Sequence, residues 1–302
     1  MIVVEVDVAN GKFNFEIVGL ADTAVKESRE RVRSAIKNSS CKFPDQHITV
    51  NLAPADLKKD GSGLDLPIAI GILAAQARLE LPKDDAPVFV GELALDGSLR
   101  PVSGILPMIL RARDEGRGSI FIPAGNAEEG ELVDGINVFT APHLSEIVRH
   151  LKGEAALLPL KKCLRFSEEE IPTTVDFSDV QGQVVAKRAL EIAAAGGHNI
   201  LMVGAPGAGK TMLARRLPTI LPPMTEEEAL EVTKIYSIAG LLSHRHGIVM
   251  ERPFRSPHHT VSNSALIGGG SIPKPGEVTL SHHGVLLLDE LPEFTRSSLE
   301  VL

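Results

Sequence analysis

Aromatic and cysteine residues are scarce in this sequence. Its 302 residues include no tryptophan, one tyrosine and two cysteines, and aromatic residues make up only 4% of the chain. So few rings leave little surface on which unpaired bases could stack. Cys41 and Cys163 lie far apart in the sequence, which argues against a disulfide framework and is typical of a protein from a reducing compartment.

Long apolar runs and an excess of positive charge are also missing. No uninterrupted apolar stretch reaches the ~18 residues that a membrane span needs, and the first residues lack the order of a signal peptide. We therefore expect no membrane contact and a cytoplasmic location. The formal net charge of −8 argues against a surface that is basic throughout, but it leaves room for a local basic channel for DNA.

The length and the hydrophobic fraction of 43% allow two packed domains. We predict an α/β domain over residues 1–152 and a second α/β domain over residues 176–302. Between them, residues 153–175 combine prolines, an acidic run and short apolar pieces, which is typical of a linker.

Within the first domain the pattern alternates between strands and helices. Residues 2–8 and 13–18 are expected to pair as a hairpin around Asn10 and Gly11. A helix should follow over residues 23–37, with Val25, Val32, Ala35 and Ile36 facing inward. Its charged face is typical of a solvated surface, with nucleic-acid contact as the alternative. The remaining expected elements are helices at 65–79, 104–115 and 143–151, a hairpin of 88–93 with 99–102 that turns at Asp96 and Gly97, and strands at 48–51, 119–122 and 136–139.

The most informative motif lies in the second domain and fits the pattern G-x-x-x-x-G-K-[ST]. Its residues are Gly204, Ala205, Pro206, Gly207, Ala208, Gly209, Lys210 and Thr211. Glycines let the backbone NH groups converge on phosphate oxygens, the lysine reaches the terminal phosphates and the hydroxyl can bind Mg²⁺. A glycine-rich turn in an ordinary α/β domain is the alternative interpretation.

The surroundings of this motif favour a nucleotide-binding loop. Residues 198–203 before it are expected to form a buried strand, and apolar residues after it recur at helical spacing, namely Met212, Leu213, Leu217 and Leu221. Further along, residues 284–288 predict a second apolar strand that ends in Asp289 and Glu290, as in a Walker B element. We expect Asp289 to hold Mg²⁺ with Thr211, and Lys210 and Glu290 to be the catalytic residues.

Two other segments of the second domain carry local signals. Thr225 followed by Glu228 predicts a capping box at the start of a helix. Residues 237–283 are rich in Gly, Pro, Ser and His and show little periodicity, which is typical of functional loops. A zinc site there has no nearby cysteine, and we expect the rings of neighbouring histidines to point in different directions. Solvated or hydrogen-bonded loop histidines are the alternative that we favour, with a loop facing DNA or a partner as the second.

Taken together, several segments resemble the magnesium-chelatase-like AAA+ ATPases, and within them the YifB/ComM branch. The resemblance covers nearly the whole chain. The segments are residues 50–57, 176–183, 204–211, 254–259, 273–277 and 283–294.

The resemblance implies an ATP-driven, homo-hexameric ring that acts on branched or single-stranded DNA as a helicase, with ATP and Mg²⁺ as cofactors. It implies that Met212 and the loop contact the nucleotide and that Asp179, Val180 and Gln181 line the adenine pocket. Residues 255–274 are candidates for loops that face the ring's pore. A magnesium-chelatase motor subunit, a Lon-like protease and a non-catalytic ring remain alternatives.

The first domain is similar to the proteolytic domain of Lon proteases, which need a serine nucleophile and a lysine. The Lon motif falls on residues 59–65, where Gly63 occupies the nucleophile position, and Leu106 stands where the lysine is required. We therefore expect no protease activity, although Ser62 is one position away. We also expect the chain to be a fragment, because an AAA+ sensor residue, an arginine finger and a lid do not follow Glu290 in it, and its hydrolysis to be slow.

Overall fold

The computed structural model describes residues 1–59, 61–76, 79, 81–82, 85–162, 175–242, 247–270 and 273–302. The chain divides into two compact units, Met1–Leu164 and Arg165–Leu302. Cys163 and most of the predicted linker lie outside the described residues. Among the helices of the described part, none is long and apolar enough to cross a membrane. The mixed α/β class with parallel strand pairs is confirmed.

The first sheet of unit 1 has three strands in the order β1-β3-β2. Its elements are β1 (Val3–Ala9), β2 (Asn14–Val18), α1 (Thr23–Asn38), β3 (His47–Ala53) and α2 (Asp65–Ala75). The predicted hairpin is wrong, because β3 pairs antiparallel with β1 and parallel with β2 and so separates them. The turn at Asn10 reverses the chain, but β3 takes the centre because Ile48, Val50 and Leu52 on one of its faces are completely buried.

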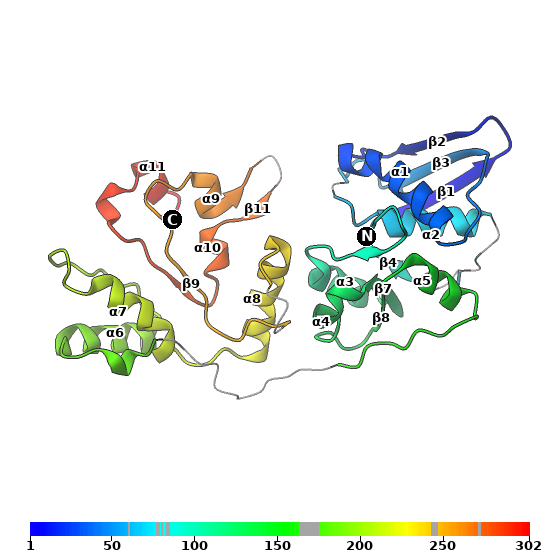
Figure 1. Ribbon diagram of the computed structural model, residues 1–302. Coiled ribbons are helices and arrows are strands. Elements are labelled where there is room, and N and C mark those ends of the chain that lie inside the picture. The colour runs from blue at the N-terminus through cyan, green and yellow to red at the C-terminus, as the bar shows by residue number, and fades with distance from the viewer. Residues whose placement is uncertain are drawn as a thin grey trace. The chain divides into compact units, whose positions relative to one another are not determined.

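The second sheet of unit 1 is parallel, with the order β4-β7-β8, and a short antiparallel pair, β5-β6, accompanies it. The predicted hairpin turn at Asp96 and Gly97 joins β5 to β6. The elements are β4 (Val88–Phe89), β5 (Glu92–Leu93), β6 (Leu99–Arg100), α3 (Ile105–Asp114), β7 (Ser119–Pro123), η1 (Ala124–Asn126), α4 (Ala127–Gly130), β8 (Asn137–Ala141) and α5 (Leu144–Leu151). Figure 1 shows these elements in cyan and green.

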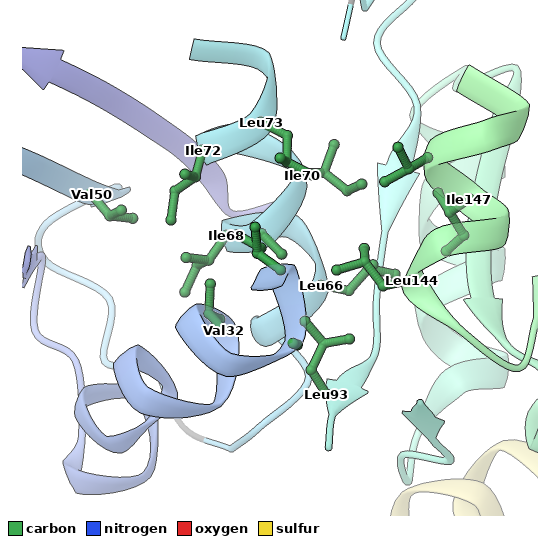
Figure 2. Packing of buried hydrophobic residues seen from close by; sticks show 14 of the residues in the cluster. Val32, Val50, Leu66, Ile68, Ile70, Ile72, Leu73, Leu93, Leu144 and Ile147 are labelled. Carbon is green, nitrogen blue, oxygen red and sulfur yellow. The ribbon is translucent and has the colours of Figure 1, made fainter. Parts of the chain in front are cut away.

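The hydrophobic core of unit 1 consists of buried side chains from its helices and from strands of both sheets (Figure 2). The residues predicted to face inward from α1, which are Val25, Val32, Ala35 and Ile36, are at most 1% exposed, as expected. Beyond its first residue, Asp65, helix α2 is apolar on all sides and contributes Leu66, Ile68, Ile70, Ile72 and Leu73, each at most 1% exposed. A helix that is apolar all round must be covered on all sides. It therefore lies at the centre of the unit.

Unit 2 consists mostly of short elements. They are η2 (Phe177–Asp179), α6 (Val184–Gly196), α7 (Lys210–Arg216), η3 (Leu217–Ile220), α8 (Glu226–Ala239), β9 (Phe254–Arg255), α9 (Asn263–Ile267), β10 (Gly268–Gly269), β11 (Lys274–Pro275), α10 (Glu277–Leu280), β12 (Val285–Leu286), η4 (Leu291–Glu293) and α11 (Arg296–Leu299). Several of them fall in residues 237–283, for which the sequence predicted little regular structure. Strand β12 pairs in parallel with β9, and β10 pairs with β11.

The strand predicted over residues 198–203 does not form. Leu201 and Val203 are 73% and 89% exposed, whereas Met202 packs against the buried cluster around Phe177. Strands need a neighbour that completes their hydrogen bonds, and in the described part of unit 2 β12 bonds to β9 instead. Strand β12 spans only Val285 and Leu286 of the strand predicted over residues 284–288, because its partner β9 is itself only two residues long. The apolar residues of these segments are compatible with strands, but strand pairing depends on partners elsewhere in the chain.

The capping box predicted at the start of α8 is present. The Thr225 hydroxyl accepts a hydrogen bond from the Glu228 NH at 3.2 Å, and the Glu228 carboxylate accepts one from the Thr225 NH at 3.0 Å. Each interaction satisfies an NH group that has no partner within the helix.

Replacing Thr225 with Ala is expected to lower the free energy of unfolding of unit 2 by about 1 kcal/mol, because the Glu228 NH loses its acceptor. Tyr236 on α8 is the only tyrosine and the chain has no tryptophan, so intrinsic fluorescence during urea unfolding reports on unit 2 alone. Thr225→Ser keeps the hydroxyl and is the matched control. Equal stability of the Ala and Ser variants would contradict the capping role.

Candidate nucleotide-binding site

The predicted phosphate-binding loop lies directly before α7, at the N-terminal end of that helix. Gly207 and Gly209 have φ angles of +77° and +88°, which side-chain-bearing residues rarely adopt. Residues 204–208 are exposed, and Met212 on the first turn of α7 is 40% exposed. The loop therefore has the glycine conformations and the open surface that backbone contact with phosphate requires.

Lys210, the first residue of α7, folds back over this loop. Its Nζ donates hydrogen bonds to the carbonyl oxygens of Gly204 at 2.8 Å and Ala205 at 3.1 Å. Both acceptors belong to the loop itself. The ammonium group thus lies over the same turn whose NH groups are expected to hold phosphate.

Thr211 and Asp289 come together although they lie far apart in the sequence. The Thr211 hydroxyl donates a 2.6 Å hydrogen bond to Asp289 Oδ2. The other oxygen of Asp289, Oδ1, accepts a hydrogen bond from the Glu290 NH at 3.0 Å. The structure therefore unites the two residues predicted to hold Mg²⁺, and it orients the Asp289 carboxylate through both oxygens.

Glu290 is the residue predicted to orient water, and it has a left-handed backbone with φ +54°. Its side chain is 70% exposed, and its Oε2 lies 3.8 Å from His259 Nδ1. The sequence did not single out this partner, because His259 lies in a loop whose path only the folded chain defines. In the sequence, the adjacency of His258 and His259 was the only local feature that drew attention to this histidine.

The residues predicted to line an adenine pocket pack near α7, with differing roles. Val180 is 4% exposed and lies in a buried cluster with Phe177, Leu190 and Leu213, the last of which belongs to α7. Asp179 instead accepts a hydrogen bond from the Asp176 NH at 2.9 Å and lies 3.6 Å from Arg216.

Gln181 is exposed, and the nearby Gln183 reaches the loop itself. Its amide donates a 3.4 Å hydrogen bond to the Ala208 carbonyl. Gln183 belongs to one of the resembling segments but was not predicted as a site residue. Its contact with Ala208 could not be foreseen, because it depends on the left-handed conformation of Gln183 at the start of α6, with φ +50°.

The degenerate Lon-like site of unit 1 has no serine–lysine pair among the described residues. The Ser62 hydroxyl donates to Glu92, and the buried Lys59 donates from Nζ to the Pro54 carbonyl. Leu106, at the position where the Lon lysine would stand, is completely buried. A serine bonded to a carboxylate lacks the amine base that Lon-type chemistry uses.

Two models of known protein families match this chain. A model described as "Magnesium chelatase, subunit ChlI" matches residues 176–302, and one described as "Subunit ChlI of Mg-chelatase" matches residues 4–126. The class is that of AAA+-type ATPases, whose members generally use a nucleotide and Mg²⁺.

Individual relatives narrow the family further. The chain is 48% identical to "Competence protein ComM" of Haemophilus influenzae over 308 residues, covering 100% of this chain and 59% of that protein. It is 47% identical to "Uncharacterized protein YifB" of Escherichia coli over 308 residues, covering 100% of this chain and 58% of that protein. The chain belongs to the magnesium-chelatase-like family of ComM and YifB, and it spans less than two thirds of the length of these relatives.

The similarity to Lon proteases is also present. "Lon protease 2" of Bacillus subtilis is 26% identical over 160 residues, which cover 48% of this chain and 28% of that protein. The resemblance predicted from the sequence is thereby confirmed for the family and for its Lon-like part.

Proposed function

We propose that the chain binds Mg·ATP at the loop of residues 204–211 and hydrolyses it. The observation that carries the proposal is the 2.6 Å hydrogen bond between Thr211 Oγ1 and Asp289 Oδ2, which joins the end of the glycine-rich loop to the acidic residues after β12. Two separate sequence elements with the expected chemistry converge on one point. A solvated strand end or an unrelated glycine turn would not require this meeting.

The donor set fits Mg²⁺, which prefers oxygen ligands in octahedral geometry. Neighbouring ligands of an octahedral ion with bonds of 2.0–2.1 Å lie roughly 2.9 Å apart, so the Thr211 and Asp289 oxygens need little adjustment to share one ion. When bound, Mg²⁺ neutralises phosphate charge and orients the β- and γ-phosphate oxygens. Thr211 and Asp289 would hold it there, directly or through water.

Lys210 and Glu290 would supply the remaining chemistry. Lys210 would exchange its two carbonyl acceptors for phosphate oxygens, which are stronger partners because they are charged. Glu290, exposed and next to His259, would accept a proton from a water aligned with the γ-phosphate. Val180 beside α7 and the exposed Gln181 would border the adenine.

Replacing Asp289 with Asn should weaken Mg·ATP binding by about tenfold while leaving affinity for Mg-free ATP nearly unchanged. The amide keeps the shape of the side chain but loses the charge that a hard cation prefers. Isothermal titration with and without Mg²⁺ measures both affinities. Glu293→Gln, an exposed carboxylate in the same segment, is the matched control. A similar loss in the absence of Mg²⁺ would contradict a role in metal binding.

We further propose that the whole protein is a hexameric DNA motor of the helicase type. Support comes from its 48% identity to a protein named for competence and from the AAA+ class, whose members commonly assemble into oligomers. Within residues 255–274, the exposed Lys274 is a candidate contact to the phosphate backbone of DNA, whereas the Arg255 guanidinium is already paired with Glu277. Because the proposed activity consumes ATP, which is available in the cytoplasm, the proposal includes a cytoplasmic location.

Measuring ATP hydrolysis with and without branched or single-stranded DNA tests the motor proposal. The measurement is made on this chain and on a full-length member of the ComM and YifB family. Stimulation by DNA, and a hexamer in ATP by light scattering, are the expected results. Activity that is indifferent to every DNA tested would exclude the DNA motor while leaving Mg·ATP binding intact. It would favour a chelatase-type motor subunit or a non-catalytic ring.

A further inference from the structure

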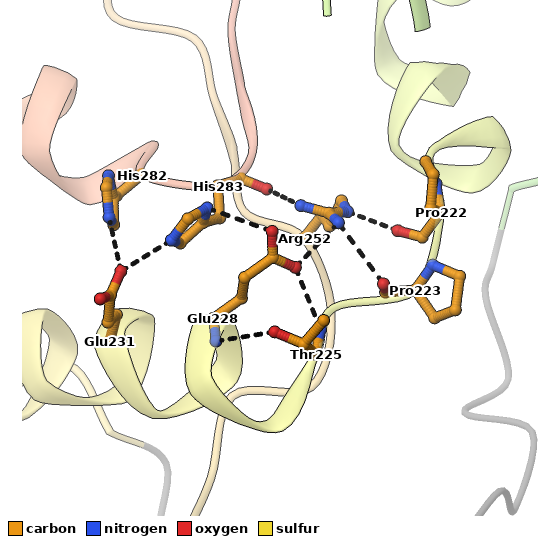
Figure 3. Close-up of polar contacts among 8 residues, drawn as sticks. All are labelled: Pro222, Pro223, Thr225, Glu228, Glu231, Arg252, His282 and His283. Carbon is orange, nitrogen blue, oxygen red and sulfur yellow. Dashed lines mark hydrogen bonds and ion pairs between the residues drawn. The ribbon is translucent and has the colours of Figure 1, made fainter. Parts of the chain in front are cut away.

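A cluster of two histidines and a glutamate lies in unit 2, in residues that the proposed nucleotide site does not use. His282 and His283 follow α10 and lead through Gly284 into β12, and Glu231 lies on α8 (Figure 3). Glu231 Oε2 is 2.8 Å from His283 Nε2 and 3.2 Å from His282 Nε2. The expectation that neighbouring histidine rings diverge is wrong here, since both rings reach one carboxylate oxygen.

The positions of these three atoms suit a transition metal. One ligand atom from each residue lies within 4.8 Å of the others, and the two histidine ring centroids are 4.0 Å apart. In a tetrahedral zinc site with bonds of 2.0–2.1 Å, ligand atoms lie roughly 3.3 Å from one another. Small side-chain rotations therefore suffice to admit an ion. Two imidazoles with one carboxylate is a zinc donor set that leaves a fourth position for water.

The second nitrogen of His283 also has a carboxylate partner. Its Nδ1 lies 3.6 Å from Glu228 Oε1, while its Nε2 faces Glu231. A neutral imidazole carries a single N–H and can donate on one side only. With a metal on Nε2, the proton would lie on Nδ1 and face Glu228, which is the carboxylate–histidine–metal arrangement of many zinc proteins.

Glu228, which would be the hydrogen-bond partner of the metal-bound His283, is itself held in place. Its Oε2 accepts hydrogen bonds from Arg252 at 3.1 Å and from the Thr225 NH at 3.0 Å. Arg252 in turn donates to the His283 carbonyl at 2.6 Å. The network fastens the first turn of α8 to the backbone of the very residue that would bind the metal (Figure 3).

Exposure is consistent with loading from solution. The side chains of Glu231, His282 and His283 are 53%, 47% and 26% exposed, so an ion can enter.

We propose that Glu231, His282 and His283 form a Zn²⁺ site that ties α8 to the segment entering β12. The ion would replace the two hydrogen bonds to Glu231 Oε2 by three metal bonds, one from each residue. This inference does not depend on nucleotide binding, which uses Thr211 and Asp289 instead.

The test is a zinc titration of the tag-free chain against a chromogenic chelator, with excess Mg²⁺ to occupy the exposed carboxylates. One equivalent of Zn²⁺ per chain is expected for the wild type. Glu231→Gln, His282→Ala and His283→Asn should each weaken the affinity by about tenfold or more, since even outer partners of a metal contribute that much. Asn suits residue 283 because it tolerates the φ of +55° found there.

His258→Ala is the matched control, because His258 and His259 are also adjacent rings 4.0 Å apart but lack Glu231. Wild-type zinc affinity in this variant, together with its loss in Glu231→Gln, supports the site. Absence of binding to the wild type, unchanged affinity in Glu231→Gln, or an equal loss in His258→Ala would each overturn it.

A second measurement separates loss of a ligand from loss of the fold. Tyr236 fluorescence melting without metal should give similar midpoints for the wild type and Glu231→Gln, because Glu231 is half-exposed. Zn²⁺ should raise the midpoint of the wild type only, as any ligand of the folded state does. An equal rise in Glu231→Gln would contradict the assignment.

Discussion

Replacing Lys210 with Ala is expected to weaken Mg·ATP binding on the order of 100-fold, because a hydrogen bond to a charged group contributes about 1.5–3 kcal/mol and the lysine makes more than one. In the structure its Nζ lies over the carbonyls of Gly204 and Ala205, within the loop that we propose binds phosphate. Isothermal titration or competition with a fluorescent ATP analogue gives the affinity.

Arg215→Ala provides the matched control, since Arg215 is an exposed cation on the same helix, α7. Its affinity should equal that of the wild type. The circular dichroism of both variants should be unchanged, because neither side chain is buried. Retained ATP affinity in Lys210→Ala would place the nucleotide elsewhere and would remove the basis of the proposed function.

Replacing Arg31 with Met is expected to lower the free energy of unfolding of unit 1 by about 3–5 kcal/mol, the usual cost of leaving a buried charge without its partner. Arg31 bonds Asp65 in bidentate fashion, Nε to Oδ2 at 2.7 Å and NH2 to Oδ1 at 3.1 Å. The Asp65 side chain is 1% exposed and also accepts from the Leu93 NH at 3.2 Å. The pair thus joins α1 to α2 and β5 at the centre of the unit.

The pH dependence of this loss is a sharper test than its size. Burial raises the pKa of Asp65 above its usual value, and the hydrogen bond from Arg31 opposes that rise. A carboxyl with a raised pKa favours the folded state below its unfolded pKa, and this contribution disappears as pH rises through the folded pKa. Without Arg31 the pKa rises further, so the variant should be most destabilised near neutral pH and less so in acid.

Urea unfolding followed by far-ultraviolet circular dichroism at neutral and acidic pH measures this dependence. The double variant Arg31→Met with Asp65→Leu is the control, because replacing both members of a buried pair by apolar groups costs little. It should recover much of the stability at neutral pH. A loss in Arg31→Met that is the same at both pH values would contradict an electrostatic origin.

The elements that could be predicted were those with signals inside one short stretch of sequence. The period of Val25, Val32, Ala35 and Ile36 predicted both the helix α1 and its buried face. Thr225 and Glu228 predicted a capping box from their spacing alone. Gly207 and Gly209 have the positive φ angles that a phosphate-binding loop needs.

The errors fell where the outcome depends on which distant segment becomes a partner. The turn at Asn10 suggested a hairpin, yet β3 lies between β1 and β2. Residues 198–203 are apolar enough for a strand, yet Val203 remains 89% exposed. The adjacent residues His282 and His283 were expected to diverge, yet a glutamate on α8 draws both rings together.

The family, the mixed α/β class and the glycine, lysine and carboxylate residues of the candidate site could be predicted from the sequence, because each depends on residue types within short segments. That Thr211 meets Asp289, that Ser62 bonds Glu92 and that Glu231 faces two histidines became clear only from the folded chain. Such contacts join residues far apart in the sequence. Their formation depends on how whole elements pack, and no local pattern of side chains carries that information.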